Sequence, residues 1–180
     1  MTFNTPVDIF RFIKEIEMKM LGHGKLTESS LCRFWNGSPE HVRNKMVGMW
    51  NLLNSHVVSE DCLKSYIYDL FIENIFKNRG KIIANLNENT IQKYDRKVFK
   101  NQRQRDKNFI RLFLSKQKMA ENDLFKVGES GLSPATMLLE KGYISPFVLS
   151  DNMDKMTYPE KSNDIQKKIT KLATIIREVN

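Results

Sequence analysis

The five prolines of this chain constrain its fold more than any other sequence feature. Proline is favoured at the first position of an α-helix, because its missing N–H would have no hydrogen-bond partner there. A Ser or Thr that can cap the helix precedes four of them, in Thr5-Pro6, Ser38-Pro39, Ser133-Pro134 and Ser145-Pro146. Tyr158-Pro159 lacks only the capping hydroxyl. The prolines therefore predict five helix starts.

Apolar residues at helical spacing predict four helices in the first part of the chain, over residues 6–21, 27–34, 39–53 and 59–78. Gly22 is expected to end the first helix and Gly80 the fourth, and Asn36-Gly37 is expected to form a turn. Residues 80–89 mix a short β-capable run with three asparagines and are typical of a connector. We place a domain boundary there, after residue 84.

The second half of the chain predicts one long helix followed by short ones. The long helix covers residues 90–118, with apolar residues near both ends and none in its middle. A helical turn at 123–127 and helices at 134–141, 146–156 and 159–179 follow. The expected fold is all-α, with an N-terminal helical domain over residues 1–84 and a C-terminal one over residues 85–180.

The net charge of +8 is concentrated in one segment. Residues 77–118 contain 13 Lys and Arg but only three Asp and Glu, whereas the segments on either side each have a net charge of −1. Such a concentration indicates a polyanionic partner. No apolar run approaches the ~20 residues of a spanning helix, and no signal peptide is recognisable, so we expect a soluble cytoplasmic protein with no membrane partner.

The strongest candidate site is a stripe of five cations on the long helix, Arg96, Lys100, Arg103, Lys107 and Arg111, whose spacings of 4, 3, 4 and 4 place them on one face. Like charges so arranged destabilise an isolated helix, which favours a nucleic acid as counter-charge over a merely solvated face. The neighbouring candidates for DNA contact are Lys77, Arg79, Lys81, Lys97 and Arg105. Because the middle of this helix lacks apolar residues, we expect replacement of Arg103 and Lys107 by Ala to leave core packing intact.

A second candidate is residues 29–53, which have the outline of a helix-turn-helix with Arg43 and Lys45 near the start of the second helix. Ordinary packing of two consecutive helices gives the same outline. A sequence-specific transcription regulator that uses residues 39–53 as recognition helix therefore stays open. A virion or host-interaction protein, whose stripe meets an acidic protein, stays open too.

Signatures of catalysis are missing from the sequence. The segment from Gly22 to Thr27 resembles part of a phosphate loop but lacks its first glycine and a preceding strand. The three histidines lie on separate segments, and Cys32 and Cys62 have no zinc-type spacing, so both cysteines are interpreted as buried small hydrophobes. We expect no enzyme activity, no metal and no cofactor.

Three segments resemble, in the same order, the T4-type phage DNA helicase assembly protein family. They are Val7 to Lys14, Val42 to Asn74 with its closing Tyr-Ile-Tyr-Asp-Leu-Phe-Ile-Glu-Asn, and Met137 to Ser145 followed by Phe147 to Leu149. The chain departs from the family at 77–83, where the family tends to carry a Trp-containing turn, so only Arg43 and Lys45 are carried over as binding residues. The resemblance implies a two-domain helical protein that binds forked and single-stranded DNA, contacts a single-strand-binding protein and loads a replicative helicase.

Overall fold

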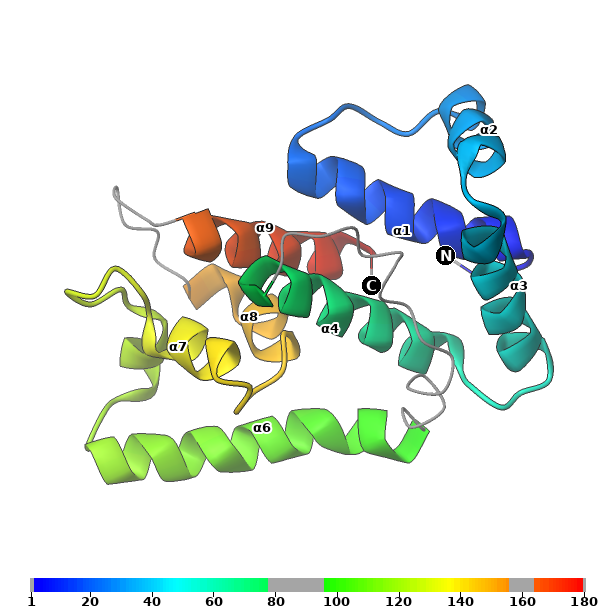
Figure 1. The fold of residues 1–180 in the computed structure, drawn as a ribbon. Coiled ribbons are helices and arrows are strands. Elements are labelled where there is room, and N and C mark those ends of the chain that lie inside the picture. Colours follow the sequence, from blue (N-terminus) through cyan, green and yellow to red (C-terminus); the bar gives the residue numbers. More distant parts are fainter. Residues whose placement is uncertain (1, 78–95, 156–163, 180) are drawn as a thin grey trace. The chain divides into compact units, whose positions relative to one another are not determined.

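The computed structural model describes residues 2–77, 96–155 and 164–179 (Figure 1). The described residues contain helices and no strand, which confirms the all-α prediction. Contacts group them into two compact units, one built mainly of residues 2–74 and the other mainly of residues 100–155 and 164–179. The predicted connector over residues 80–89, and with it the predicted boundary after residue 84, lies outside the described residues.

The first unit begins with four helices: α1 (Pro6–Leu21), α2 (Glu28–Gly37), α3 (Glu40–Asn54) and α4 (Glu60–Lys77). The bounds of α1 are those predicted from the sequence. The Asp8 carboxylate accepts a hydrogen bond from the backbone N–H of Thr5 at 2.9 Å, which satisfies a donor at the start of the helix. Gly22 ends α1 with a φ of 74°, a left-handed conformation that costs glycine little.

The core of the first unit is built on α1, which packs against α2 and α3 (Figure 1). Phe10 meets Trp35 of α2 edge to face, with ring centroids 5.3 Å apart. Phe12 meets Tyr68 of α4 in the same manner at 5.6 Å. The predicted inward positions Val42, Met46 and Met49 of α3 are buried, whereas Trp50 and Leu53 are half-buried.

Helix α4 is buried on nearly all sides, since every residue from Cys62 to Tyr68 is buried. A helix that is apolar around most of its circumference belongs in an interior. Its start agrees with the sequence, because the Ser59 hydroxyl accepts a hydrogen bond from the backbone N–H of Cys62 at 3.1 Å.

The predicted turn at Asn36-Gly37 is wrong. Helix α2 continues through Gly37 and ends at Ser38, whose hydroxyl donates to the carbonyl of Phe34 at 2.6 Å. Because that hydroxyl is hydrogen-bonded to the last turn of α2, it does not cap α3. Helix α3 begins at Glu40, one residue later than predicted.

The second unit contains α6 (Arg96–Gln117), the 3₁₀ turn η2 (Glu121–Phe125), α7 (Pro134–Glu140), α8 (Phe147–Asp151), the 3₁₀ turn η3 (Met153–Lys155) and α9 (Asp164–Val179). Helix α8 packs against α9, and α7 packs against η2. The predicted helix at 146–156 is interrupted at Asn152, and the predicted start at Pro159 lies outside the described residues. Among the described helices, none has both the length and the apolar character of a membrane-spanning segment.

Candidate nucleic-acid interface

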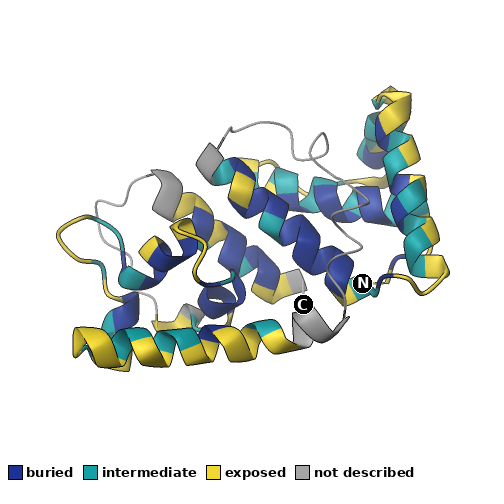
Figure 2. Ribbon diagram, turned by 60° about the horizontal axis from the view of Figure 1, so that its bottom comes forward, coloured by how far each residue is buried: buried dark blue, intermediate teal, exposed yellow. Residues whose placement is uncertain are grey.

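Helix α6 carries the predicted cation stripe and is the most exposed long helix of the second unit. Figure 2 shows it mostly in the colours of exposed and half-buried residues. The side chains described on it begin at Asn101, so those of Arg96, Lys97 and Lys100 lie outside the description, and so do those of Lys77, Arg79 and Lys81. Of the five stripe residues, the structure therefore places Arg103, Lys107 and Arg111.

Arg103 is held by other residues of the second unit. Its guanidinium forms an ion pair with Asp151 of α8, with Nε and Oδ2 3.0 Å apart. The same group lies 4.4 Å from the ring centroid of Phe147. The spacing of cations along α6 gave no sign of these contacts, because Asp151 follows Arg103 by 48 positions. That replacing Arg103 and Lys107 by Ala leaves core packing intact stays a prediction.

Asp106 connects the middle of α6 to the turn before α8. It is 2% exposed and accepts hydrogen bonds from the backbone N–H of Ser145 at 3.3 Å, from the Ser145 hydroxyl, and from the Gln102 amide at 3.0 Å. Burial raises the pKa of Asp106, while the hydrogen bonds from Ser145 and Gln102 and the charge of Arg103 act in the opposite direction. The middle of α6 thus contributes a buried polar contact, where the sequence suggested only an exposed surface.

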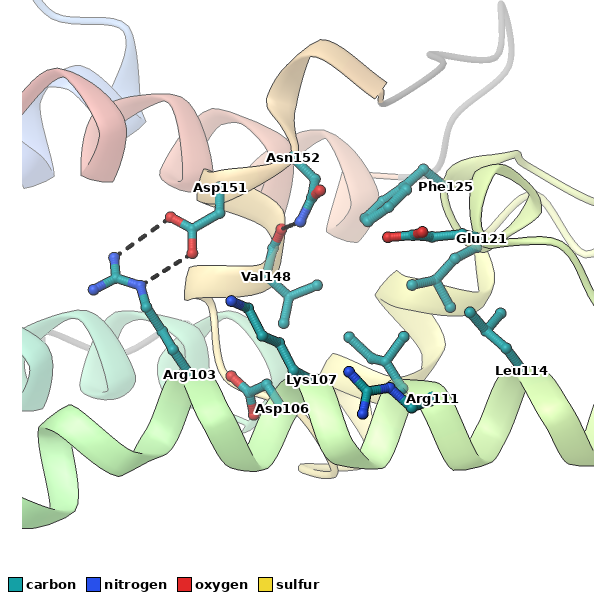
Figure 3. Close-up of a pocket in the computed structure, with 12 residues that line it drawn as sticks. Arg103, Asp106, Lys107, Arg111, Leu114, Glu121, Phe125, Val148, Asp151 and Asn152 are labelled. Atoms are coloured by element: carbon teal, nitrogen blue, oxygen red, sulfur yellow. Dashed lines mark hydrogen bonds and ion pairs between the residues drawn. The ribbon is translucent and has the colours of Figure 1, made fainter.

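A groove of about 460 Å³ runs beside α6 and is bordered by η2 and α8 (Figure 3). Its apolar lining comes from Ile110, Leu114, Leu124, Phe125 and Val148. All three described stripe residues also line it, and Figure 3 shows Arg103 turned toward Asp151.

The charges that line this groove are balanced. Arg103, Lys107 and Arg111 stand against three carboxyl groups, those of Asp106, Glu121 and Asp151. Arg103 and Asp151 neutralise each other, and Asp106 is buried. The groove is therefore less cationic than the stripe alone predicts, since two of its acids, Glu121 and Asp151, come from segments outside α6.

Four cations of α6 are exposed and form no ion pair or hydrogen bond within the described part of the chain. We call them the free cations, and they are Arg105, Lys107, Arg111 and Lys116. Asp106 is the only carboxylate within α6, and it points into the unit. Sequence reasoning identified three of the four but did not single out Lys116.

Arg43 and Lys45, the candidates on α3, lie in a different environment. The Arg43 guanidinium donates to the carbonyls of Trp35 at 3.4 Å and of Ser38, which close the end of α2. Lys45 is half-buried. Arg43 therefore stabilises the junction between α2 and α3, and a role for these two residues in DNA binding stays a prediction.

A stacked aromatic pair on another side of α6 was missed by the sequence analysis. The rings of Phe109 and Tyr143 are stacked with centroids 5.4 Å apart and planes 12° from parallel. Tyr143 is 56% exposed. Its position directly after Gly142, at the end of a short helix, was the only sequence signal that could have marked it.

The described residues contain no group of three or more His, Cys, Asp or Glu side chains that could hold a metal ion. Cys62 is buried as predicted, but Cys32 is exposed, so that part of the prediction is wrong. A smaller groove of about 400 Å³ in the first unit is lined by residues including Trp50, His56 and Glu60.

Comparison of the chain with protein families, curated proteins and solved structures found no match. The resemblance to helicase assembly proteins accordingly stays a prediction from three segments of the sequence.

Proposed function

We propose that this protein is a DNA-binding adaptor without a catalytic site of its own, and that α6 makes its principal phosphate contacts. The observation that carries the proposal is the set of free cations on α6, Arg105, Lys107, Arg111 and Lys116. Their helix contains a single carboxylate, which is buried, so no acid on α6 offsets their charge at the surface.

Phosphates supply ion-pair partners, which these four side chains do not have within the described part of the chain. Lys107 and Arg111 lie four residues apart on α6 and repel each other, and a polyanion relieves that repulsion while releasing its own condensed counterions. The concentration of the net charge in residues 77–118 supports the same partner. Arg103 is left out of the set because Asp151 already neutralises it.

Within this proposal, the finer role is the loading of a replicative helicase onto forked or single-stranded DNA. It is supported by the three collinear segments that resemble the helicase assembly proteins. The partners it requires are a replicative helicase and a single-strand-binding protein.

The proposal is tested by fluorescence anisotropy with labelled fork, single-stranded and duplex DNA at several salt concentrations. If the four free cations each neutralise one phosphate, the slope of log K against log salt is about −3.6 on duplex and about −2.8 on a single strand. The loader role predicts the highest affinity for the fork. A slope near zero would exclude DNA as the partner, and a single preferred duplex sequence would favour a transcription regulator.

A charge-matched pair of variants locates the binding surface. Replacing Lys107 and Arg111 with Ala should weaken binding to every DNA and reduce the magnitude of the salt slope by about 2 on duplex. The control replaces Lys167 and Lys168, two exposed lysines of α9, with Ala and removes the same charge. Equal losses in the two variants would indicate attraction by net charge alone rather than contact with α6.

A further inference from the structure

The backbone of Tyr143 is held at the end of α7, and its ring is positioned by stacking on Phe109. The N–H of Tyr143 donates to the carbonyl of Leu138 at 2.9 Å, and Gly142 adopts a φ of 78°, which turns the chain at the end of α7 toward α6. The ring then stacks on Phe109 of α6, with 56% of the residue left exposed. An aromatic surface is thus presented to solvent in a defined orientation.

Cations and a further apolar side chain lie along the same side of α6. Arg105, Phe109, Leu112 and Lys116 follow each other at spacings of four, three and four, which aligns them on the helix. Leu112 is 72% exposed, and Arg105 and Lys116 belong to the free cations. At a rise of about 1.5 Å per residue, the two cations lie roughly 16 Å apart along the axis, one on each side of the aromatic pair.

We propose that Tyr143, supported by Phe109, is a base-stacking site for single-stranded nucleic acid whose phosphates contact Arg105 and Lys116. This inference rests on the proposed DNA-binding function and names the form of nucleic acid that α6 recognises. Every base has a π-face that can stack on an aromatic ring, and a strand that stacks this way needs cations beside the rings for its backbone. A base paired within a duplex has both faces covered by its neighbours, so only an unpaired base can use Tyr143.

The first test compares two labelled single strands with equal numbers of phosphates, an oligothymidylate and an abasic oligonucleotide of the same length. Stacking is expected to make the oligothymidylate bind about 5-fold more tightly or better, because the abasic strand offers phosphates without bases. Equal affinity for the two strands would overturn the inference while leaving DNA binding through phosphates in place. Failure to bind either strand, together with failure to bind the fork and the duplex, would overturn the proposed function as well.

Three variants test whether the preference for the oligothymidylate over the abasic strand depends on the ring of Tyr143. Tyr143→Ala and Tyr143→Leu should both reduce the ratio of the two affinities to about 1, whereas Tyr143→Phe should keep it. Because Leu keeps an apolar side chain over Phe109, the Leu variant distinguishes the effect of losing the aromatic ring from the effect of losing the packing on Phe109. Circular dichroism checks that each variant keeps its helical content. A preference for the oligothymidylate that persists in the folded Leu variant would overturn the inference.

The remaining alternative is that the aromatic pair binds a second copy of the chain. Size-exclusion chromatography of the wild type would then show a dimer that Tyr143→Ala dissociates, and this result would overturn the inference. A monomer in both proteins, combined with loss of the base preference in the variant, is the expected result.

Discussion

Arg103 and Lys107 are one helical turn apart on α6, yet their surroundings differ. Arg103 contacts Asp151 and the ring of Phe147, whereas Lys107 has no partner in the described part of the chain. The spacing of the cations was enough to assign both residues to one face. It could not distinguish them, because the carboxylate that engages Arg103 follows it by 48 positions.

We therefore expect two single replacements on α6 to affect stability to different extents. Arg103→Ala should lower the free energy of unfolding by about 1 kcal/mol, since it removes a half-exposed ion pair and a contact with an aromatic ring. Lys107→Ala should change it by less than about 0.5 kcal/mol. Urea denaturation followed by circular dichroism measures both values, and equal stability of the two variants would show that the Arg103 contacts contribute nothing measurable.

Asp106 predicts a specific dependence of stability on pH. Burial raises its pKa in the folded protein above its ordinary value, so the folded state favours the protonated form. The stabilisation from that protonation is fully present below the unfolded pKa and is lost as the pH rises through the folded pKa.

The measurement compares wild type with Asp106→Asn, which cannot ionise. As the pH falls from neutral to below about 4, the wild type should gain stability relative to the Asn variant, with the change lying between the unfolded and folded pKa values of Asp106. Glu140→Gln, at an exposed position of α7, is the control for general effects of removing a carboxylate. A difference between wild type and Asp106→Asn that does not vary with pH would contradict the assignment.

At the scale of elements, the helix starts could be predicted where the capping side chain acts locally. Ser133 caps α7 as expected, because its hydroxyl accepts from the backbone N–H of Thr136 at 3.1 Å. Ser145 was expected to cap the next helix, but its hydroxyl donates to Asp106 and α8 begins at Phe147. The Ser145 hydroxyl thus bonds to a side chain on another helix instead of to the backbone at the start of α8. The sequence around Ser145 does not indicate this contact with Asp106.

The contribution of the Ser133 cap can be measured by comparison with Ser115, a serine of the same unit that caps no helix. Ser133→Ala should lower the free energy of unfolding by about 1 kcal/mol, because it leaves a buried backbone N–H without an acceptor. Ser115→Ala, at an exposed position of α6, should have little effect or a slightly stabilising one, since Ala has the higher helix propensity. Thermal unfolding of the two variants gives the comparison, and a Ser133→Ala protein as stable as wild type would show that the cap is dispensable.

At the scale of the whole molecule, apolar periodicity and proline placement predicted the fold class. The sequence predicted only part of the candidate site. The cation stripe was visible because its members share one helix. The groove and the aromatic pair were not, because each combines α6 with segments that come later in the chain. A helical pattern states which face of a helix is polar, but it does not state which other segment of the chain that face meets.

The hydrogen bonds between Asp106 and Ser145 have a consequence for how this sequence can diverge. Loss of the serine hydroxyl removes a donor to a buried carboxylate, and loss of the carboxylate removes the acceptor of both the hydroxyl and the Ser145 N–H. Either change alone costs on the order of 1–3 kcal/mol, a large part of the stability of a small domain. Positions 106 and 145 should therefore covary among descendants of this sequence. A substitution at one position should be tolerated mainly in sequences in which the other position has also changed.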